Sequence, residues 1–213
     1  MSKTPKRPTV ADIRAMKGKR TLTMLYVETP EEAAAAAEAG VDMLSIIDPV
    51  WTSEMRDAAG ACFVQVCLLY GELLTLEDYQ RAAHHAMQVG GDCVYCASSF
   101  GTIKALADDG IPVVSHVGLI PSKATWTGGF KAVGKTADSA LSVFEHVRKL
   151  EEIGCFGAEL EVVPDRIAAE IACRTSLVLL GMGAGPYADA QYLFAEDVLG
   201  YTRGHKTRHA RHY

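Results

Sequence analysis

The chain has 213 residues, of which 49% are hydrophobic and 22% are charged, and its formal net charge is −5. This composition is typical of an ordinary folded protein and argues against a disordered chain. A negative net charge gives no general attraction for nucleic acid, and no apolar run has the length of a membrane span or a signal segment. We therefore expect a single cytoplasmic domain over residues 1–213, with no nucleic acid and no membrane as partner.

Apolar runs typical of buried strands alternate with helix-like segments from residue 21 onwards. Strands are expected at residues 21–27, 42–47, 61–68, 92–97, 112–116, 156–161 and 176–181, with a short eighth at 191–194. Helices are expected at residues 30–39, 52–59, 75–89, 100–109, 136–153 and 164–173, and a long loop at 117–135. Strict alternation predicts parallel strands with right-handed crossovers. The pattern therefore favours an α/β fold, a closed (β/α)8 TIM barrel.

Polar or reactive side chains stand at the carboxyl ends of four expected strands, namely Asp48, Cys67, His116 and Glu161. In a β/α barrel the active site lies at this end of the strands, so we expect the four side chains to meet in one pocket. A carboxylate such as Asp48 can bind a hard cation, which would chelate and polarise a 2-oxo acid. Glu161 could then move protons, and His116 could donate to a developing oxyanion.

Two further segments carry less specific signals. Residues 181–185 are rich in glycine but lack the spacing, lysine and helix of a phosphate-binding loop, so glycines such as Gly183 are expected to turn the backbone tightly beside the pocket. Residues 203–212 form a basic tail. We expect a solvated or partner-docked terminus there, with binding of an anionic ligand as the alternative.

Several motifs together resemble one enzyme family. They are residues 9–19, 39–43, 116–122, 128–136, 160–164 and 181–186. In combination they are similar to ketopantoate hydroxymethyltransferase, also called 3-methyl-2-oxobutanoate hydroxymethyltransferase, of the phosphoenolpyruvate/pyruvate barrel superfamily. The resemblance implies a divalent metal, Mg²⁺, that binds a small 2-oxo acid, methylenetetrahydrofolate as co-substrate, a role in pantothenate biosynthesis and a homo-oligomer.

The resemblance also implies roles for individual residues. Asp48 and Cys67 fall at the metal-ligand positions, and His116 and Glu161 at the catalytic positions. Substrate contacts are implied for His116 and for two further residues, Tyr95 and Gly183.

The chain departs from the family pattern at four positions. Pro49 stands where the family has a serine, Cys67 where it has the second metal aspartate, and Tyr95 and Ala97 where it has Lys-x-Glu. A thiol at the metal position would suit Zn²⁺ better than Mg²⁺. The loop after Asp48 is shorter than in the family and the C-terminal helical extension is missing, so a compact version of the barrel is expected.

These departures leave three functions open, because fold alone does not determine reaction. The first is transfer of a hydroxymethyl group from methylenetetrahydrofolate to 3-methyl-2-oxobutanoate through a metal-stabilised enolate. The second is an aldolase or lyase acting on another small 2-oxo acid, with an altered or absent metal. The third is a non-catalytic barrel that binds a metabolite or serves as an assembly subunit.

Overall fold

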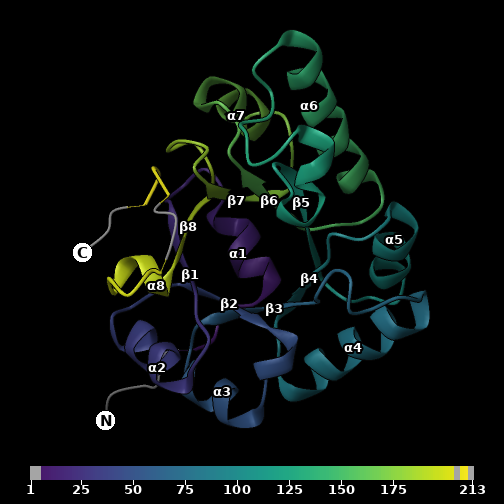
Figure 1. The fold of residues 1–213 in the computed structure, drawn as a ribbon. Coiled ribbons are helices and arrows are strands. Elements are labelled where there is room, and N and C mark those ends of the chain that lie inside the picture. The colour runs from purple at the N-terminus through teal and green to yellow at the C-terminus, as the bar shows by residue number, and fades with distance from the viewer. Residues whose placement is uncertain (1–5, 204–206, 211–213) are drawn as a thin grey trace.

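The computed structural model describes residues 6–203 and 207–210. Eight parallel strands close into a barrel in chain order, with β8 paired to β1 (Figure 1). The strands are β1 (Leu22–Tyr26), β2 (Met43–Ile47), β3 (Phe63–Cys67), β4 (Cys93–Tyr95), β5 (Val113–Gly118), β6 (Gly157–Glu161), β7 (Val178–Met182) and β8 (Ala190–Phe194). The expected (β/α)8 barrel is confirmed, and its short eighth strand is the one that completes the ring.

In the described chain, helices follow every strand except β7 and surround the barrel, and one further helix precedes β1 (Figure 1). They are α1 (Val10–Met16), α2 (Pro30–Glu38), α3 (Ser53–Ala58), α4 (Leu76–Val89), α5 (Phe100–Asp108), α6 (Ala137–Glu152), α7 (Asp165–Ala172) and α8 (Ala195–Val198), with 3-10 turns η1 (Asp48–Val50) and η2 (Pro121–Thr127). Thr29 and Thr75 form capping boxes at the starts of α2 and α4, which satisfies backbone donors at those helix ends. Among the helices described, none has both the length and the apolar character needed to cross a membrane.

Some segments differ from the expected elements or add to them. The long loop at 117–135 contains η2, and α7 begins one residue after Pro164, which is its N-cap. The opening helix α1 lies within the outline of the barrel in Figure 1, and its Ile13 belongs to the inner core. Of the basic tail, residues 204–206 and 211–212 lie outside the described part of the chain.

Two hydrophobic cores lie on opposite faces of the strands, because side chains alternate along each strand. The outer core joins strands to helices. The inner core fills the barrel with residues such as Met43 and Phe63, whose Cα atoms pair across β2 and β3. Two residues further along the same strands, the inward positions become polar, as Ser45 and Gln65. Apolar packing thus gives way to a polar layer towards the carboxyl ends.

Candidate active site

A buried histidine lies at the centre of this polar layer. His116 of β5 is 2% exposed, and its Nδ1 lies 3.2 Å from Glu159 Oε2 while its Nε2 lies 3.2 Å from Glu161 Oε2. The register explains this arrangement, because His116 pairs with Glu159 and Gly118 pairs with Glu161 on the neighbouring strand β6. The Tyr95 hydroxyl lies 2.9 Å from His116 Nδ1. One imidazole therefore faces two carboxylates.

The surroundings favour a charged imidazole. Burial by itself lowers the pKa of His116, but interactions with Glu159 and Glu161 outweigh it and raise the pKa to about 9. His116 therefore carries a proton on both nitrogens at neutral pH. Nε2 is close to Glu161 but has no well-directed hydrogen bond within the described residues. This buried donor is available to an oxygen atom of a bound molecule.

A chain of buried polar side chains holds Glu159 in place. Gln65 Nε2 donates to Glu159 Oε1 over 2.8 Å and lies 3.4 Å from Ser45 Oγ. Ser45 Oγ in turn lies 3.0 Å from Cys67 Sγ. Burial raises the pKa of Cys67 to about 12, so its side chain is a neutral thiol. These residues orient the carboxylate beneath the histidine, and Cys67 participates as a hydrogen-bonding thiol.

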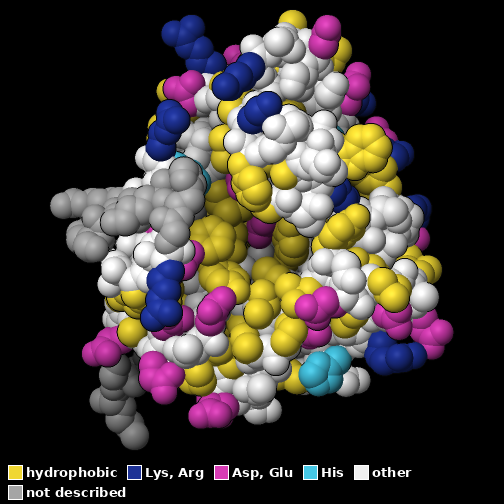
Figure 2. All heavy atoms as spheres, in the orientation of Figure 1, with side chains coloured by type: hydrophobic (Ala, Val, Ile, Leu, Met, Phe, Trp, Pro, Cys, Tyr) yellow, Lys and Arg dark blue, Asp and Glu magenta, His cyan; other side chains and the backbone are white. Residues whose placement is uncertain are grey.

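An open cavity of about 330 Å³ lies above the histidine. Its lining residues are Tyr26, Ile47, Cys67, Leu68, Leu69, Tyr70, Tyr95, His116, Pro121, Ser122, Glu159, Glu161, Met182, Tyr192 and Phe194. Figure 2 shows a hollow at the centre of this face, bordered by apolar side chains and with an acidic side chain inside it. Glu161 is the more accessible of the two carboxylates, with 15% of its side chain exposed against 6% for Glu159. We call this space the central cavity.

The backbone around Glu161 is tightly constrained. Leu119 N donates to Glu161 O over 2.9 Å, and a Cβ on Gly118 would lie 2.3 Å from that same oxygen. The next residue, Val162, has a φ of 47°, in the left-handed region that β-branched residues avoid. Strained backbone of this kind persists only where neighbouring contacts enforce it. Glu161 is thus held at the rim of the cavity by its backbone.

The structure brings together four of the expected site residues but leaves out two. Cys67, Tyr95, His116 and Glu161 all line the central cavity. Gly183 does not line it. Its φ is 62°, and a Cβ there would lie 2.8 Å from His209 Nδ1, outside the central cavity. Asp48 is the other exception.

Asp48 does not line the central cavity, whereas its neighbour Ile47 does. The inward positions of β2 are 43, 45 and 47, so Asp48 falls at the opposite parity and begins η1. Its Oδ1 is buried without a hydrogen-bond partner in the described chain, and burial raises the pKa of this carboxyl.

The expected metal pair does not form a metal site. Cys67 shares a hydrogen bond with Ser45, and Asp48 does not line the cavity that Cys67 lines. Within residues 6–203 and 207–210, no group of three or more His, Cys, Asp or Glu side chains is placed to hold a metal ion. The donor set of this chain therefore does not fit the Mg²⁺ site that the resemblance implied, nor a Zn²⁺ site.

Sequence reasoning missed Glu159, Gln65 and Ser45. Glu159 stands two residues before Glu161, and Gln65 two before Cys67, so both share a strand face with an expected site residue. This period-two spacing was the signal that could have found Glu159 and Gln65. Lys123 was also missed.

Lys123 extends from η2 to the end of β4. Its Nζ donates to Ala97 O over 2.6 Å and lies 5.2 Å from the centre of the Tyr70 ring. Burial lowers the pKa of this ammonium group. A cation thus stands beside the strand end where the resemblance expected the lysine now replaced by Tyr95.

Comparison with known proteins gives one consistent family. The sequence model described as ketopantoate hydroxymethyltransferase matches residues 52–213. The chain is 33% identical to the 3-methyl-2-oxobutanoate hydroxymethyltransferase of Thermus thermophilus, over 97% of this chain and 88% of that protein.

Solved structures show the same fold at low identity. A Burkholderia cenocepacia protein provisionally assigned as a phosphonomutase matches with a TM-score of 0.70 at 12% identity, covering 89% of this chain and 93% of that one. A 2,3-dimethylmalate lyase of the PEP mutase/isocitrate lyase superfamily matches with a TM-score of 0.62 at 14% identity, covering 91% and 83%. At these identities the structural likeness concerns the fold alone.

Proposed function

Because this chain belongs to the ketopantoate hydroxymethyltransferase family, we propose that it transfers a hydroxymethyl group to 3-methyl-2-oxobutanoate, with methylenetetrahydrofolate as the one-carbon donor. The family resemblance inferred from the motifs is thus confirmed, and with it the assignment to a family of transferases. The observation that carries the proposal is the imidazole of His116, buried between Glu159 and Glu161 beneath an open cavity.

The central cavity suits a small 2-oxo acid. Its volume of about 330 Å³ lies at the lower end of the usual range for ligand pockets, about 300–1,000 Å³. Apolar walls such as Leu68 and Met182 suit the alkyl branch of the substrate, and the polar groups lie at the floor. Lys123, whose Nζ lies 5.2 Å from the centre of the ring of the lining residue Tyr70, supplies positive charge near the cavity for the carboxylate.

The first chemical step is removal of the proton on C3, next to the carbonyl. Glu161, the more accessible carboxylate, takes this proton. The C–H electron pair forms the C2–C3 double bond, and negative charge moves to the carbonyl oxygen. The Nε2–H of His116, which is buried and lacks a well-directed partner in the described chain, stabilises that oxygen. Glu159 keeps the imidazole charged and oriented.

Water adds to the methylene carbon of the donor and breaks its two C–N bonds, which releases formaldehyde and leaves tetrahydrofolate with one proton on each of the two nitrogens. C3 of the enolate then forms the new C–C bond to that carbon, and the oxygen takes the proton held by Glu161 to become the hydroxyl of the product. No divalent metal enters these steps, because Asp48 and Cys67 do not provide its ligands. The positive charge that polarises the carbonyl is instead the imidazolium of His116. This differs from the metal-stabilised enolate that the resemblance implied.

A second reaction is favoured by one observation. Tyr95 replaces the family's lysine and its hydroxyl contacts His116 Nδ1, so the polar groups facing the substrate differ from the family pattern. This change supports action on another small 2-oxo acid, by the same proton removal followed by formation or cleavage of a C–C bond. Comparing the rates of C3 proton exchange for several 2-oxo acids would show which of them is the substrate.

The test is exchange of the C3 proton in D2O, which needs no one-carbon donor. Proton NMR would follow loss of the C3–H signal of 3-methyl-2-oxobutanoate, with pyruvate and 2-oxobutanoate in parallel. We expect exchange with the native protein and at least a hundredfold loss in Glu161→Gln, the range for losing a general base. Glu28→Gln, outside the central cavity, is the matched control. No exchange with any of the three acids would favour the non-catalytic barrel instead.

We also propose a cytoplasmic location and a homo-oligomer, with neither nucleic acid nor membrane as partner. The family membership supports the first two, and the net charge of −5 supports the absence of a nucleic-acid partner. Light scattering coupled to gel filtration measures the number of subunits.

A further inference from the structure

A second and larger cavity opens beside the central one. Its volume is about 540 Å³, and the two cavities share Glu161 in their walls. Lys131, Lys135 and Arg208 contribute to its lining, as do the apolar residues Leu119 and Phe130. We call it the cationic cavity. A molecule in it would approach the carboxylate that we propose to act on the 2-oxo acid.

The charge of this cavity is unusual for the chain. The protein carries a net charge of −5, yet among the described residues three lysine or arginine side chains line this cavity together with a single carboxylate, Glu161. In the described part of the chain, none of these three cations takes part in a salt bridge. Figure 2 shows several Lys and Arg side chains on the part of this face above the central hollow. Unpaired cations that converge on a cavity attract an anionic ligand.

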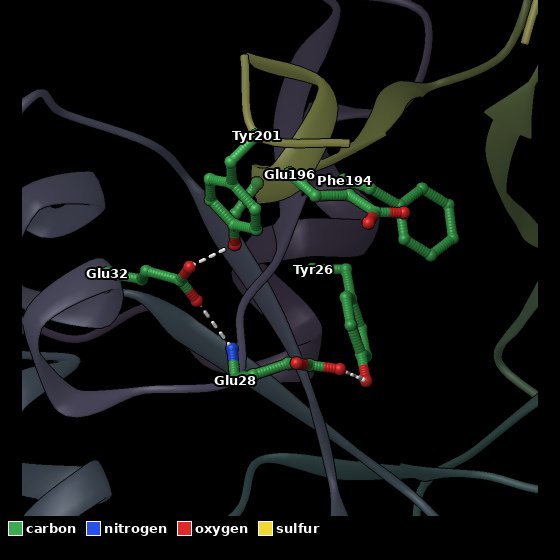
Figure 3. A pocket seen from close by; sticks show the side chains of 7 residues that line it. Tyr26, Glu28, Glu32, Phe194, Glu196 and Tyr201 are labelled. Atoms are coloured by element: carbon green, nitrogen blue, oxygen red, sulfur yellow. Dashed lines mark hydrogen bonds between the residues drawn. The ribbon is translucent and has the colours of Figure 1, made fainter. Parts of the chain in front are cut away.

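The opposite side of the central cavity has the reverse charge. A pocket of about 280 Å³ there is lined by Glu28, Glu32 and Glu196 with two tyrosines (Figure 3). Tyr26 donates to Glu28 Oε1 over 2.9 Å, and Tyr201 donates to Glu32. Tyr26 also lines the central cavity, so the two spaces adjoin. An anionic molecule that reaches the central cavity is repelled on this side and attracted on the other.

The wall between the central and cationic cavities is held by backbone hydrogen bonds. Val133 N donates to Val162 O over 3.1 Å, which ties the loop that carries Lys131 and Lys135 to the end of β6. Val162 itself, with its left-handed φ, lines the cationic cavity. The backbone that carries the lysines is therefore held beside Glu161, and a ligand bound by them lies next to this carboxylate.

We infer that the cationic cavity binds the polycarboxylate tail of the one-carbon donor, with its aromatic ring against Leu119 and Phe130. Phe130 is 76% exposed, so its ring is available for stacking. The inference depends on the proposed function, because the donor is a folate that combines an aminobenzoyl ring with one or more glutamate carboxylates. Arg208 belongs to the basic tail, so the inference also assigns part of that tail to anion binding, which the sequence left as an alternative.

The experiment compares 5-formyltetrahydrofolate with one glutamate and with five, by isothermal titration calorimetry on the full chain. We expect tighter binding of the pentaglutamate, and loss of affinity as salt increases. The double variant Lys131→Ala/Lys135→Ala should weaken pentaglutamate binding by about tenfold or more, and monoglutamate binding by less. Lys104→Ala/Arg148→Ala removes the same charge from exposed faces of α5 and α6 and should bind like the native protein.

Equal affinity for the two tail lengths, or unchanged binding in the lysine variant, would overturn the inference. Displacement of the monoglutamate and the pentaglutamate to the same extent by inorganic tripolyphosphate would also overturn it, because that result would indicate a general anion site. Circular dichroism and the melting temperature verify that both double variants fold. Proton exchange in the native protein uses no folate, so failure of the proposed function is seen in a separate measurement.

Discussion

Substitution of Glu159 by glutamine tests the electrostatics of the barrel mouth directly. The change removes one negative charge 3.2 Å from His116 Nδ1 and keeps the shape of a side chain that Gln65 already contacts. At an effective dielectric constant of about 20, Coulomb's law limits this interaction to about 5 kcal/mol. Measured effects of one neighbouring charge are smaller, roughly 1–3 pKa units, or about 1–4 kcal/mol. The pKa of His116 should therefore fall from about 9 to between roughly 6 and 8.

The assay is an NMR titration of the imidazole C2 proton, with the signal of His116 assigned through His116→Gln. Glu28→Gln is the control, because it removes a carboxylate that contacts Tyr26 and leaves the pair around His116 intact. The proton-exchange rate in Glu159→Gln should then decline at a lower pH than in the native protein, following the imidazolium. If the pKa of His116 stays near 9 in Glu159→Gln, our account of how the charge is held is wrong.

The pKa of His116 is raised from 6.5 in a free side chain to about 9, so its contribution to stability is complete below about pH 6.5 and is lost as pH rises through 9. The free energy of unfolding, measured in urea, should decline by about 3 kcal/mol across this pH range, and His116→Gln should remove most of the decline. A free energy of unfolding that does not change with pH in the native protein would contradict the assignment. Gly118→Ala should lower the free energy of unfolding by roughly 1–3 kcal/mol more than Gly110→Ala. Both glycines have a positive φ, but only at Gly118 would a Cβ clash with a backbone atom, the carbonyl oxygen of Glu161. Equal losses in urea unfolding would refute the clash. Prolonged chelation with EDTA, or added Mg²⁺, should leave proton exchange unchanged, and a rate that tracks Mg²⁺ would restore the metal-dependent mechanism.

The fold could be predicted because local signals agreed with one another. Alternating apolar runs and helix caps such as Thr75 are short-range features, and they coincide with the strands and helices observed. His116 and Glu161 could be placed at the barrel mouth for the same reason, since Glu161 ends a recognisable strand and His116 lies two residues before the end of another. Which polar groups would touch His116 depended on register, and strand register is a long-range property.

Two different causes explain why the placement of Asp48 differed from expectation and why Glu159 was missed. The position of Asp48 relative to its strand end was read correctly, but one residue decides whether a side chain faces the barrel interior, and the start of η1 turns the chain there. Glu159 was overlooked because it lies inside an apolar strand, where a carboxylate is costly unless it is paired. Its partners, Gln65 and His116, come from two other strands, and only closure of the barrel brings them together.

The seam between the first and last strands has a consequence for how the protein is made. Leu22 pairs with Ala190, and Lys17 Nζ lies 2.7 Å from Asp189 Oδ2, which also accepts from Leu179 N. The first strand therefore lacks its second neighbour until the other seven strands have been synthesised. Until then its open edge is a template for pairing with other nascent chains. We expect closure of this seam to be a late event in folding, and the seam to be where amide protons exchange first when the ring opens.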